Sequence, residues 1–288
     1  MQTSETARYK VQQLKQLPAL SITVSRLLSM LSNADLEIDD LAKVIEQDPP
    51  LTARIIGLAN AAYFSPPRPI SSVTEAIIRV LGLQMVKTLA LSIALCGAFD
   101  TSRCPGFRLD EYWFRAFASA QLARNLVMQM NAKQRLDPDE IYLTALLLDI
   151  GVLVLVHEFP EAYAKVLAEL QKEPAQNVGR LEQDHLGISS LQAGEWLTER
   201  WNLPQFVVQA ITVRSMPEAE APRLPASQLI ELILAWLIDP NEGQLSSLFE
   251  QSVLGQELSL SAEKWNKIEV DFMQQLGEIR QIAKFLAS

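Results

Sequence analysis

The sequence has 288 residues, of which 49% are hydrophobic, and a formal net charge of −9. A chain of this length and composition can bury a substantial core, and its acidic character disfavours binding to phosphate backbones. The charge is uneven, because residues 1–135 carry 15 basic and 11 acidic side chains whereas residues 136–288 carry 10 and 23. Any contact with nucleic acid is therefore expected in the first part, whose net charge is +4, and not in the second part, at −13.

The cysteines and the first residues predict a cytoplasmic protein. Cys96 and Cys104 form neither a CxxC pair nor a disulfide framework, which favours ordinary packing residues in a reducing compartment. Residues 1–5 lack the basic and apolar regions of a signal peptide, and no uncharged apolar run reaches the roughly 18 residues of a membrane span. We therefore expect no membrane partner.

Apolar residues in the first part of the chain recur at spacings of three and four, which predicts helices and no strand. The predicted helices cover residues 1–16, 22–33, 36–45, 49–62, 76–81 and 84–98. Asp48 is expected to cap the helix that starts at Pro49, because proline is tolerated in a first turn. Ser72 and Glu75 have the spacing of a capping box. Tyr63–Ile70 contains three prolines and is expected to be an ordered loop.

A break over Gly97–Phe107 is expected to join this first lobe to a second helical lobe. The helices predicted for the second lobe cover residues 110–130, 140–156, 161–171, 187–200 and 204–213. Residues 215–225 are acidic and proline-rich, as in a surface connection, and three helical segments follow them. The last segment carries an apolar stripe from Trp265 to Leu286 that must pack on something. The second lobe is the expected partner, and another copy in a homodimer is the alternative.

The most apolar stretch, Leu143–Val156, contains a single carboxylate, Asp149. Burying a lone charge costs several kcal/mol unless a cation, a metal or hydrogen-bond donors meet it. Asp149 is therefore expected to have a partner or to lie at the edge of the core. The nature of that partner separates a catalytic site from a non-catalytic one.

Several short motifs follow one another in a definite order. They are Leu17-Pro18, Asp48-Pro49, Ala59-Asn60-Ala61, Glu75-Ala76-Ile77, Leu81-Gly82, Tyr112-Trp113-Phe114-Arg115, Leu147-Leu148-Asp149-Ile150-Gly151 and Asp184-His185-Leu186-Gly187. Together they resemble the HDOD domain, a divergent relative of the HD metal-dependent phosphohydrolases. The resemblance covers residues 14–213. It implies an all-α fold in which an N-terminal helical lobe (14–100) packs on an HD-like helical lobe (105–213), with residues 214–288 as a C-terminal helical extension.

The resemblance also implies a degenerate metal site. Catalytic HD proteins have metal-binding histidines where this chain has Arg115 and Leu148, beside the aspartate that matches Asp149. Because leucine has no lone pair to donate and arginine is positively charged, the site is not expected to hold a catalytic metal. We expect Asp149 to pair with Arg115, or else to cap neighbouring amides. If a metal binds at all, Asp149 and His185 are its candidate ligands.

Two histidines are present, and each has a structural interpretation. His185 is either a residue at the start of a helix with a local hydrogen bond or a remnant of the former metal pocket. His157 is expected to contact the C-terminal end of the central helix. HDOD proteins often have a His-His pair where this chain has Val213-Arg214.

The resemblance implies a non-catalytic protein of bacterial signal transduction, which binds a protein partner or a small ligand and needs no cofactor. Arg54, Arg68 and Arg79 surround the proline-rich loop and form a candidate surface for an acidic partner or a phosphate-bearing ligand. The alternative function is a metal-dependent phosphohydrolase acting on a nucleotide or cyclic nucleotide. No nucleophile elbow, glycine-rich phosphate loop or CxxC motif supports another enzyme class.

A third hypothesis is DNA binding by a helix-turn-helix around Gly82, with residues 84–98 as the reading helix. Only Gln84, Lys87 and Thr88 offer polar groups for base contacts there, and most of the other side chains are apolar. Binding to nucleic acid is therefore not expected.

Overall fold

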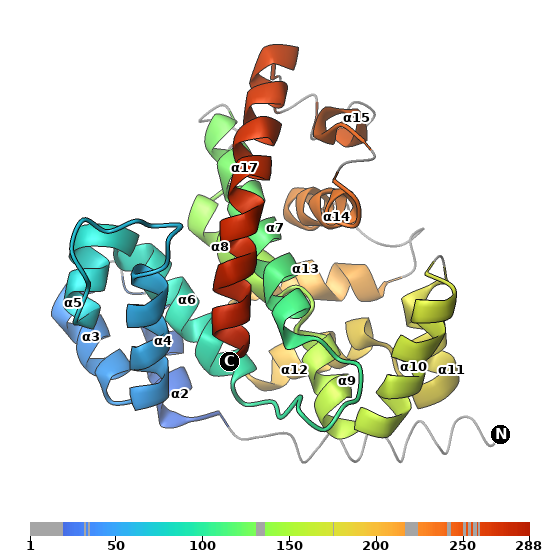
Figure 1. Ribbon diagram of the computed structural model, residues 1–288. Helices are drawn as coiled ribbons and strands as arrows, with labels where there is room; N and C mark the ends of the chain where they lie inside the picture. Colours follow the sequence, from blue (N-terminus) through green and yellow to red (C-terminus); the bar gives the residue numbers. More distant parts are fainter. Residues whose placement is uncertain are drawn as a thin grey trace.

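The computed structural model describes residues 20–130, 136–216 and 224–288, apart from positions 32, 34, 175, 241, 242, 250, 251, 253, 254, 256, 257 and 259. All regular structure in the described residues is helical, which confirms the all-α fold class (Figure 1). The helix predicted over residues 1–16 and most of the connection predicted over 215–225 lie outside the described residues.

The N-terminal lobe is the group of helices drawn in blue and cyan in Figure 1. Its elements are α2 (Ile22–Leu31), α3 (Ile38–Glu46), α4 (Pro49–Ala59), α5 (Val73–Ala76), the π-helical turn η2 (Ile77–Leu81) and α6 (Leu83–Cys96). Asp48 caps α4 as predicted, since its Oδ1 accepts the N–H of Leu51 at 3.1 Å. Ser72 accepts the N–H of Glu75, but the Glu75 carboxylate accepts from Ser71 and not from the backbone of Ser72. Only half of the predicted capping box is formed.

The proline-rich loop is held by two side chains, which explains how a segment without regular structure stays ordered. The amide group of Asn60 accepts the N–H of Ile70 and donates to its carbonyl, both at 2.9 Å. The hydroxyl of Tyr63 accepts from Gln121 at 3.0 Å and donates to Gln275 at 3.3 Å. The loop therefore ties the N-terminal lobe to two helices from later in the chain.

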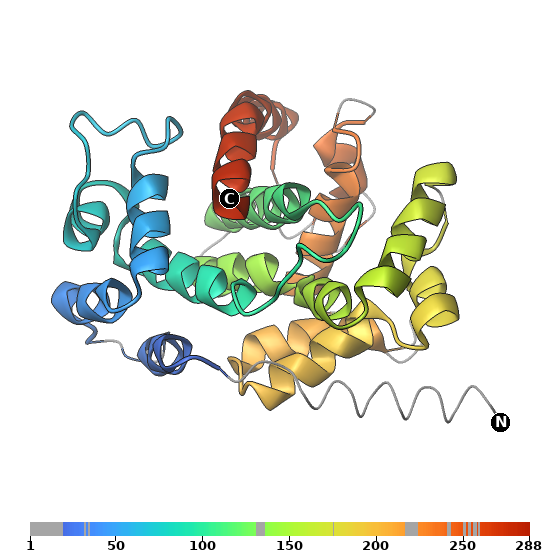
Figure 2. The ribbon, with the colours of Figure 1, turned by 60° about the horizontal axis from the view of Figure 1, so that its bottom comes forward.

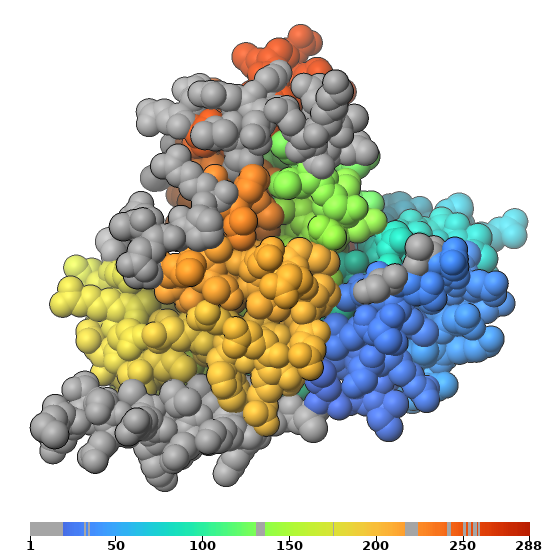
Figure 3. Space-filling model, turned by 180° about the vertical axis from the view of Figure 1, so that it is seen from behind, coloured from blue at the N-terminus to red at the C-terminus, as the bar shows by residue number. Residues whose placement is uncertain are grey.

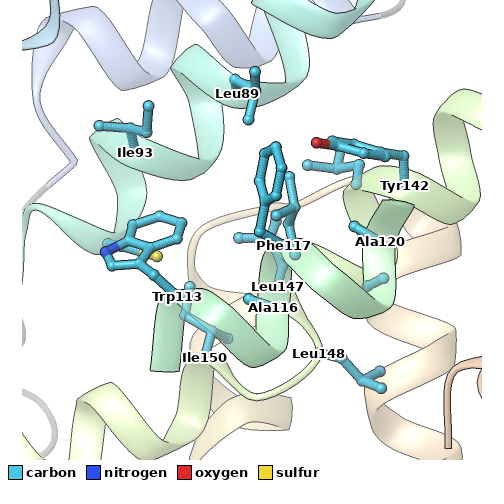
Figure 4. Close-up of a cluster of buried hydrophobic side chains, with 14 of the residues drawn as sticks. Leu89, Ile93, Trp113, Ala116, Phe117, Ala120, Tyr142, Leu147, Leu148 and Ile150 are labelled. Atoms are coloured by element: carbon cyan, nitrogen blue, oxygen red, sulfur yellow. The ribbon is translucent and has the colours of Figure 1, made fainter. Parts of the chain in front are cut away.

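The central lobe follows the loop after α6. Its helices are α7 (Leu109–Gln129), α8 (Pro138–Leu147), α9 (Ile150–Glu158), α10 (Pro160–Lys172), α11 (Val178–Leu186), α12 (Ser190–Arg200) and α13 (Gln205–Ser215). Trp113 and Phe117 of α7 are buried among apolar side chains of α6, α8 and α9 (Figure 4). The core is thus continuous between the lobes, and from behind the N-terminal lobe (blue) abuts the segment near residue 200 (gold) (Figure 3).

Residues 138–158 form two helices where a single central helix was expected over 140–156. By length and composition alone, this segment could also cross a membrane, although Asp149 interrupts its apolar run. However, 78% of its most apolar window is buried inside the fold. Burial in the protein core accounts for the apolar composition, as it does in the core helices of globular proteins.

The C-terminal extension contains α14 (Pro225–Trp236), α15 (Leu245–Phe249) and α17 (Ala262–Ala287). As expected for its apolar stripe, α17 packs along α7 of the central lobe, and Figures 1 and 2 show the two helices side by side. The guanidinium of Arg280 lies 3.9 Å from the ring centroid of Phe114 and donates to Glu111 at 2.7 Å. The ring of Phe285 covers Gly57, so α17 also contacts α4 of the N-terminal lobe.

Candidate functional site

Asp149 lies at the junction between α8 and α9. Its backbone has φ −102° and ψ 20°, outside the helical region, and its side chain caps no amide, so the capping alternative was wrong. The side chain is 31% exposed. Both sequence-based expectations hold, because Asp149 is at the edge of the core and also has a charged partner.

That partner is Arg214, in the last turn of α13. Its Nη1 donates to Oδ1 of Asp149 at 3.0 Å and to the carbonyl of Leu148 at 3.1 Å, while its Nε donates to Glu231 of α14 at 3.0 Å. The prediction that Asp149 pairs with Arg115 was therefore wrong, because the arginine that pairs with Asp149 is Arg214. Because α13 packs against α8, Arg214 reaches the junction directly, whereas Arg115 is half-buried on α7.

A second carboxylate, Glu182, is fully buried near this junction. It accepts hydrogen bonds from the backbone N–H of Ser190 at 2.7 Å, from the Ser190 hydroxyl at 2.9 Å and from the Tyr163 hydroxyl at 3.3 Å. Burial raises the pKa of Glu182 above its usual value, the hydrogen bonds from Ser190 and Tyr163 oppose the rise, and the negative charge of Asp149 adds to it. The charge of Asp149 therefore reaches Glu182.

The sequence analysis did not identify Glu182 as a site residue. The spacing in the sequence does indicate that Glu182 is buried. Glu182 lies four residues before the buried Leu186 and therefore on the same, apolar face of α11. It joins three helices, since Tyr163 comes from α10 and Ser190 from α12. This network holds α10, α11 and α12 together beside the Asp149 junction.

Gly151, in the first turn of α9, allows α12 to approach α9 closely. A Cβ atom on Gly151 would lie 1.9 Å from the carbonyl oxygen of Ser190 and 2.6 Å from the amide nitrogen of Gly194. Only a residue without a side chain fits between these backbones. Gly151 therefore helps to place Ser190 where it meets Glu182.

His185 lies in the last turn of α11 and not at a helix start, so that interpretation was wrong. The helix ends at Gly187, whose φ of 72° is left-handed, a conformation that glycine adopts without strain. Nε2 of His185 is 2.9 Å from Oε1 of Glu169 on α10. The ring thus contributes to the contact between α10 and α11.

His157 lies in the last turn of α9, as expected, and holds the connection between the lobes. Its Nδ1 accepts the backbone N–H of Asp100 at 3.0 Å, and its carbonyl accepts from Arg103 at 2.9 Å. The ring also makes an edge contact with Phe99. These interactions give His157 a structural role.

The donors around Asp149 do not fit a catalytic metal ion. In the part of the chain that the structure describes, no group of three or more His, Cys, Asp or Glu residues is arranged to hold one. Leu148 is buried and apolar (Figure 4), and Arg214 brings a positive charge to the carboxylate that a metal would need. The chemistry of these side chains favours an ion pair over a metal centre.

The candidate binding arginines occupy three different environments. Arg54 of α4 lines a cavity, Arg68 is exposed on the proline-rich loop, and Arg79 pairs with Glu75 at 3.4 Å on the surface. In the helix considered for DNA reading, Lys87 is 6% exposed and Thr88 is 3% exposed. These two polar side chains are therefore buried in the lobe and are not available for contacts with bases.

Known proteins resemble this chain over most of its length. An uncharacterized protein of Treponema pallidum (strain Nichols) is 26% identical over 210 residues, which are 73% of this chain and 40% of the relative. The chain thus spans less than half the length of that relative. A crystal structure of a "putative signal transduction protein" from Marinobacter aquaeolei VT8 has a TM-score of 0.80 and 26% identity, over 99% of this chain and 66% of that one.

Two further solved structures share the fold. A "putative phosphohydrolase" of Shewanella amazonensis SB2B has a TM-score of 0.75 and 21% identity, over 96% of this chain and 97% of that one. An HDOD domain protein with unknown function from Geobacter sulfurreducens has a TM-score of 0.73 and 22% identity, covering 98% and 97%. The family model of the HDOD domain matches residues 17–217. The chain therefore belongs to the HDOD domain family.

Proposed function

We propose that this protein is a non-catalytic regulatory component of bacterial signal transduction, with a degenerate HD-type site. In this proposal it acts in the cytoplasm by binding a protein partner or a small ligand. The Marinobacter relative, named for signal transduction, supports the biological context. The observation that carries the proposal is the ion pair between Arg214 and Asp149.

The ion pair supports the proposal that the site does not bind a catalytic metal, because the positive charge of Arg214 opposes a second cation at Asp149. A divalent cation at Asp149 would meet the guanidinium of Arg214, which is 16% exposed and therefore poorly screened by water. Arg214 is also held by the Leu148 carbonyl and by Glu231, so moving it away would break three interactions. A guanidinium in this place can neutralise the acid and can join α13 and α14 to the junction.

A metal and turnover assay tests this proposal. We expect purified protein to contain no stoichiometric transition metal, and to hydrolyse bis(p-nitrophenyl) phosphate with Mn²⁺ no faster than an Asp149→Ala variant does. Asp184→Ala is the matched control, since its carboxylate is 68% exposed on α11. Stoichiometric metal together with turnover that is lost in Asp149→Ala, but kept in Asp184→Ala, would support the phosphohydrolase alternative instead.

A gain-of-binding variant makes the same test stronger. The double substitution Leu148→His and Arg214→His removes the blocking cation and adds two imidazole ligands next to Asp149. We expect this variant to bind Zn²⁺ or Mn²⁺ at least tenfold more tightly than the unchanged protein, measured by calorimetry. Equal affinity in the two proteins would mean that Arg214 is not what prevents metal binding.

A further inference from the structure

The N-terminal lobe contains a cavity of about 370 Å³ between α2, α4 and the end of α6. Its walls are mainly apolar, and ligand pockets in proteins usually have volumes of about 300–1,000 Å³. The apolar lining includes Leu20, Val24, Pro50, Leu51, Ile93 and Leu95. The cavity is partly open to solvent, and its size and character suit the apolar part of a small molecule.

Arg54 is the cation in this lining. Arg54 is half-buried as a residue, and its guanidinium makes no hydrogen bond or ion pair with any residue in the described ranges. The group has five N–H donors, and donors taken out of bulk water are costly when they remain unpaired. Burial raises the pKa of Cys96 to about 12, and the charge of Arg54 acts against this rise, so the guanidinium lies near the end of α6.

The other two polar side chains in the cavity wall each have a hydrogen-bond partner within the fold. Asp48 accepts the N–H of Leu51 as the cap of α4, and the hydroxyl of Ser21 accepts the N–H of Val24. By contrast, Arg54 combines a full positive charge with unused donors beside an apolar surface. The wall therefore offers one cation, Arg54, to an anionic head group, and it also carries the negative charge of Asp48.

We propose that this cavity binds a small amphiphilic carboxylate, with its head group on Arg54 and its hydrocarbon chain against α2 and α6. A planar carboxylate matches the guanidinium fork with two parallel hydrogen bonds, and the apolar walls favour removal of the chain from water. This inference names the ligand class of the proposed regulatory function and rests on that function for its biological meaning. The site itself is in the N-terminal lobe, apart from Asp149.

Calorimetric titration of the full chain with decanoate tests the inference, with 1-decanol as the uncharged probe of equal chain length. We expect saturable binding of one decanoate per chain. Arg54→Gln should weaken decanoate binding at least tenfold, as the loss of a charge-assisted hydrogen-bonded pair implies. Arg68→Gln is the matched control and should not change the affinity, since Arg68 is exposed and is not part of the cavity wall.

A second variant tests the cavity without changing Arg54. Ala94→Phe places a ring in the wall, and we expect it to weaken decanoate binding while the circular dichroism spectrum stays helical. No saturable binding to the unchanged protein, equal affinity in Arg54→Gln, or equally tight binding of decanol and decanoate would each overturn the inference. None of these outcomes depends on the metal assays at Asp149, so the two proposals can fail separately.

Discussion

Nη1 of Arg214 lies 3.0 Å from Oδ1 of Asp149, and the two side chains are 16% and 31% exposed. Because Arg214 is largely shielded from water, removing Asp149 would leave its charge facing only the half-exposed Glu231, and removing Arg214 would leave Asp149 without its cation. The pair therefore joins the α8–α9 junction to α13 more firmly than a surface ion pair could.

Arg214→Gln is expected to lower the free energy of unfolding by about 1–3 kcal/mol, because it removes the charge that faces Asp149. Urea denaturation measures the change. Arg108→Gln is the control, since Arg108 is 62% exposed in its pair with Asp110 and should change stability by about 0.5 kcal/mol or less. If Arg214→Gln and Asp149→Asn have strictly additive effects in a double-mutant cycle, the pair is not coupled.

Gly151→Ala is expected to destabilise the protein by about 1–3 kcal/mol or more, because its Cβ would collide with the backbone of α12. Gly277→Ala provides the opposite case within α17. No atom of the described residues lies within 4 Å of a Cβ at that position, so alanine should raise stability by about 0.5–1 kcal/mol. Thermal unfolding of both variants checks the pair of predictions, and a Gly151→Ala protein as stable as the original would contradict the close contact between α9 and α12.

Glu182→Gln is expected to change how stability depends on pH. The pKa of Glu182 is raised in the folded state above the value of 4.5 for an unperturbed carboxyl, so the native state holds this proton more tightly than the unfolded state. The stabilisation that results is complete below the unfolded pKa and is lost as pH rises through the folded pKa. The stability of Glu182→Gln relative to the original should therefore increase with pH from about 4.5 upward.

Urea denaturation across this pH range measures the effect, and Glu173→Gln controls for removal of an exposed charge. The same pH profile for Glu182→Gln and the original protein would show that this carboxyl does not titrate differently in the fold.

Phe285→Ala is expected to loosen the end of α17 from the N-terminal lobe, because the ring of Phe285 covers Gly57 of α4. Amide hydrogen exchange should become faster in the last turns of α17 and in α4. Val270→Ala is the control on the same helix, since Val270 is 44% exposed. Unchanged exchange in α4 would mean that the ring does not hold the lobes together.

The local features of the helices could be predicted because they depend on neighbouring residues. Asp48 caps α4 because an acceptor three residues before a free N–H is within reach in any helix start. The apolar stripe of α17 likewise required a docking surface, and α7 provides it. The break at Asp149 was missed, since Leu143–Val156 is apolar throughout and its pattern does not distinguish one helix from two.

The sequence by itself determined the helical class, the resemblance to the HDOD family and the requirement that Asp149 have a partner. Only the tertiary structure decided that this partner is Arg214 and not Arg115. It also decided that Glu182 is buried and accepts hydrogen bonds from Ser190 and Tyr163. The reason is physical. Periodicity and capping act within a few residues, whereas Arg214 is 65 positions from Asp149 and meets it only because α13 packs against α8.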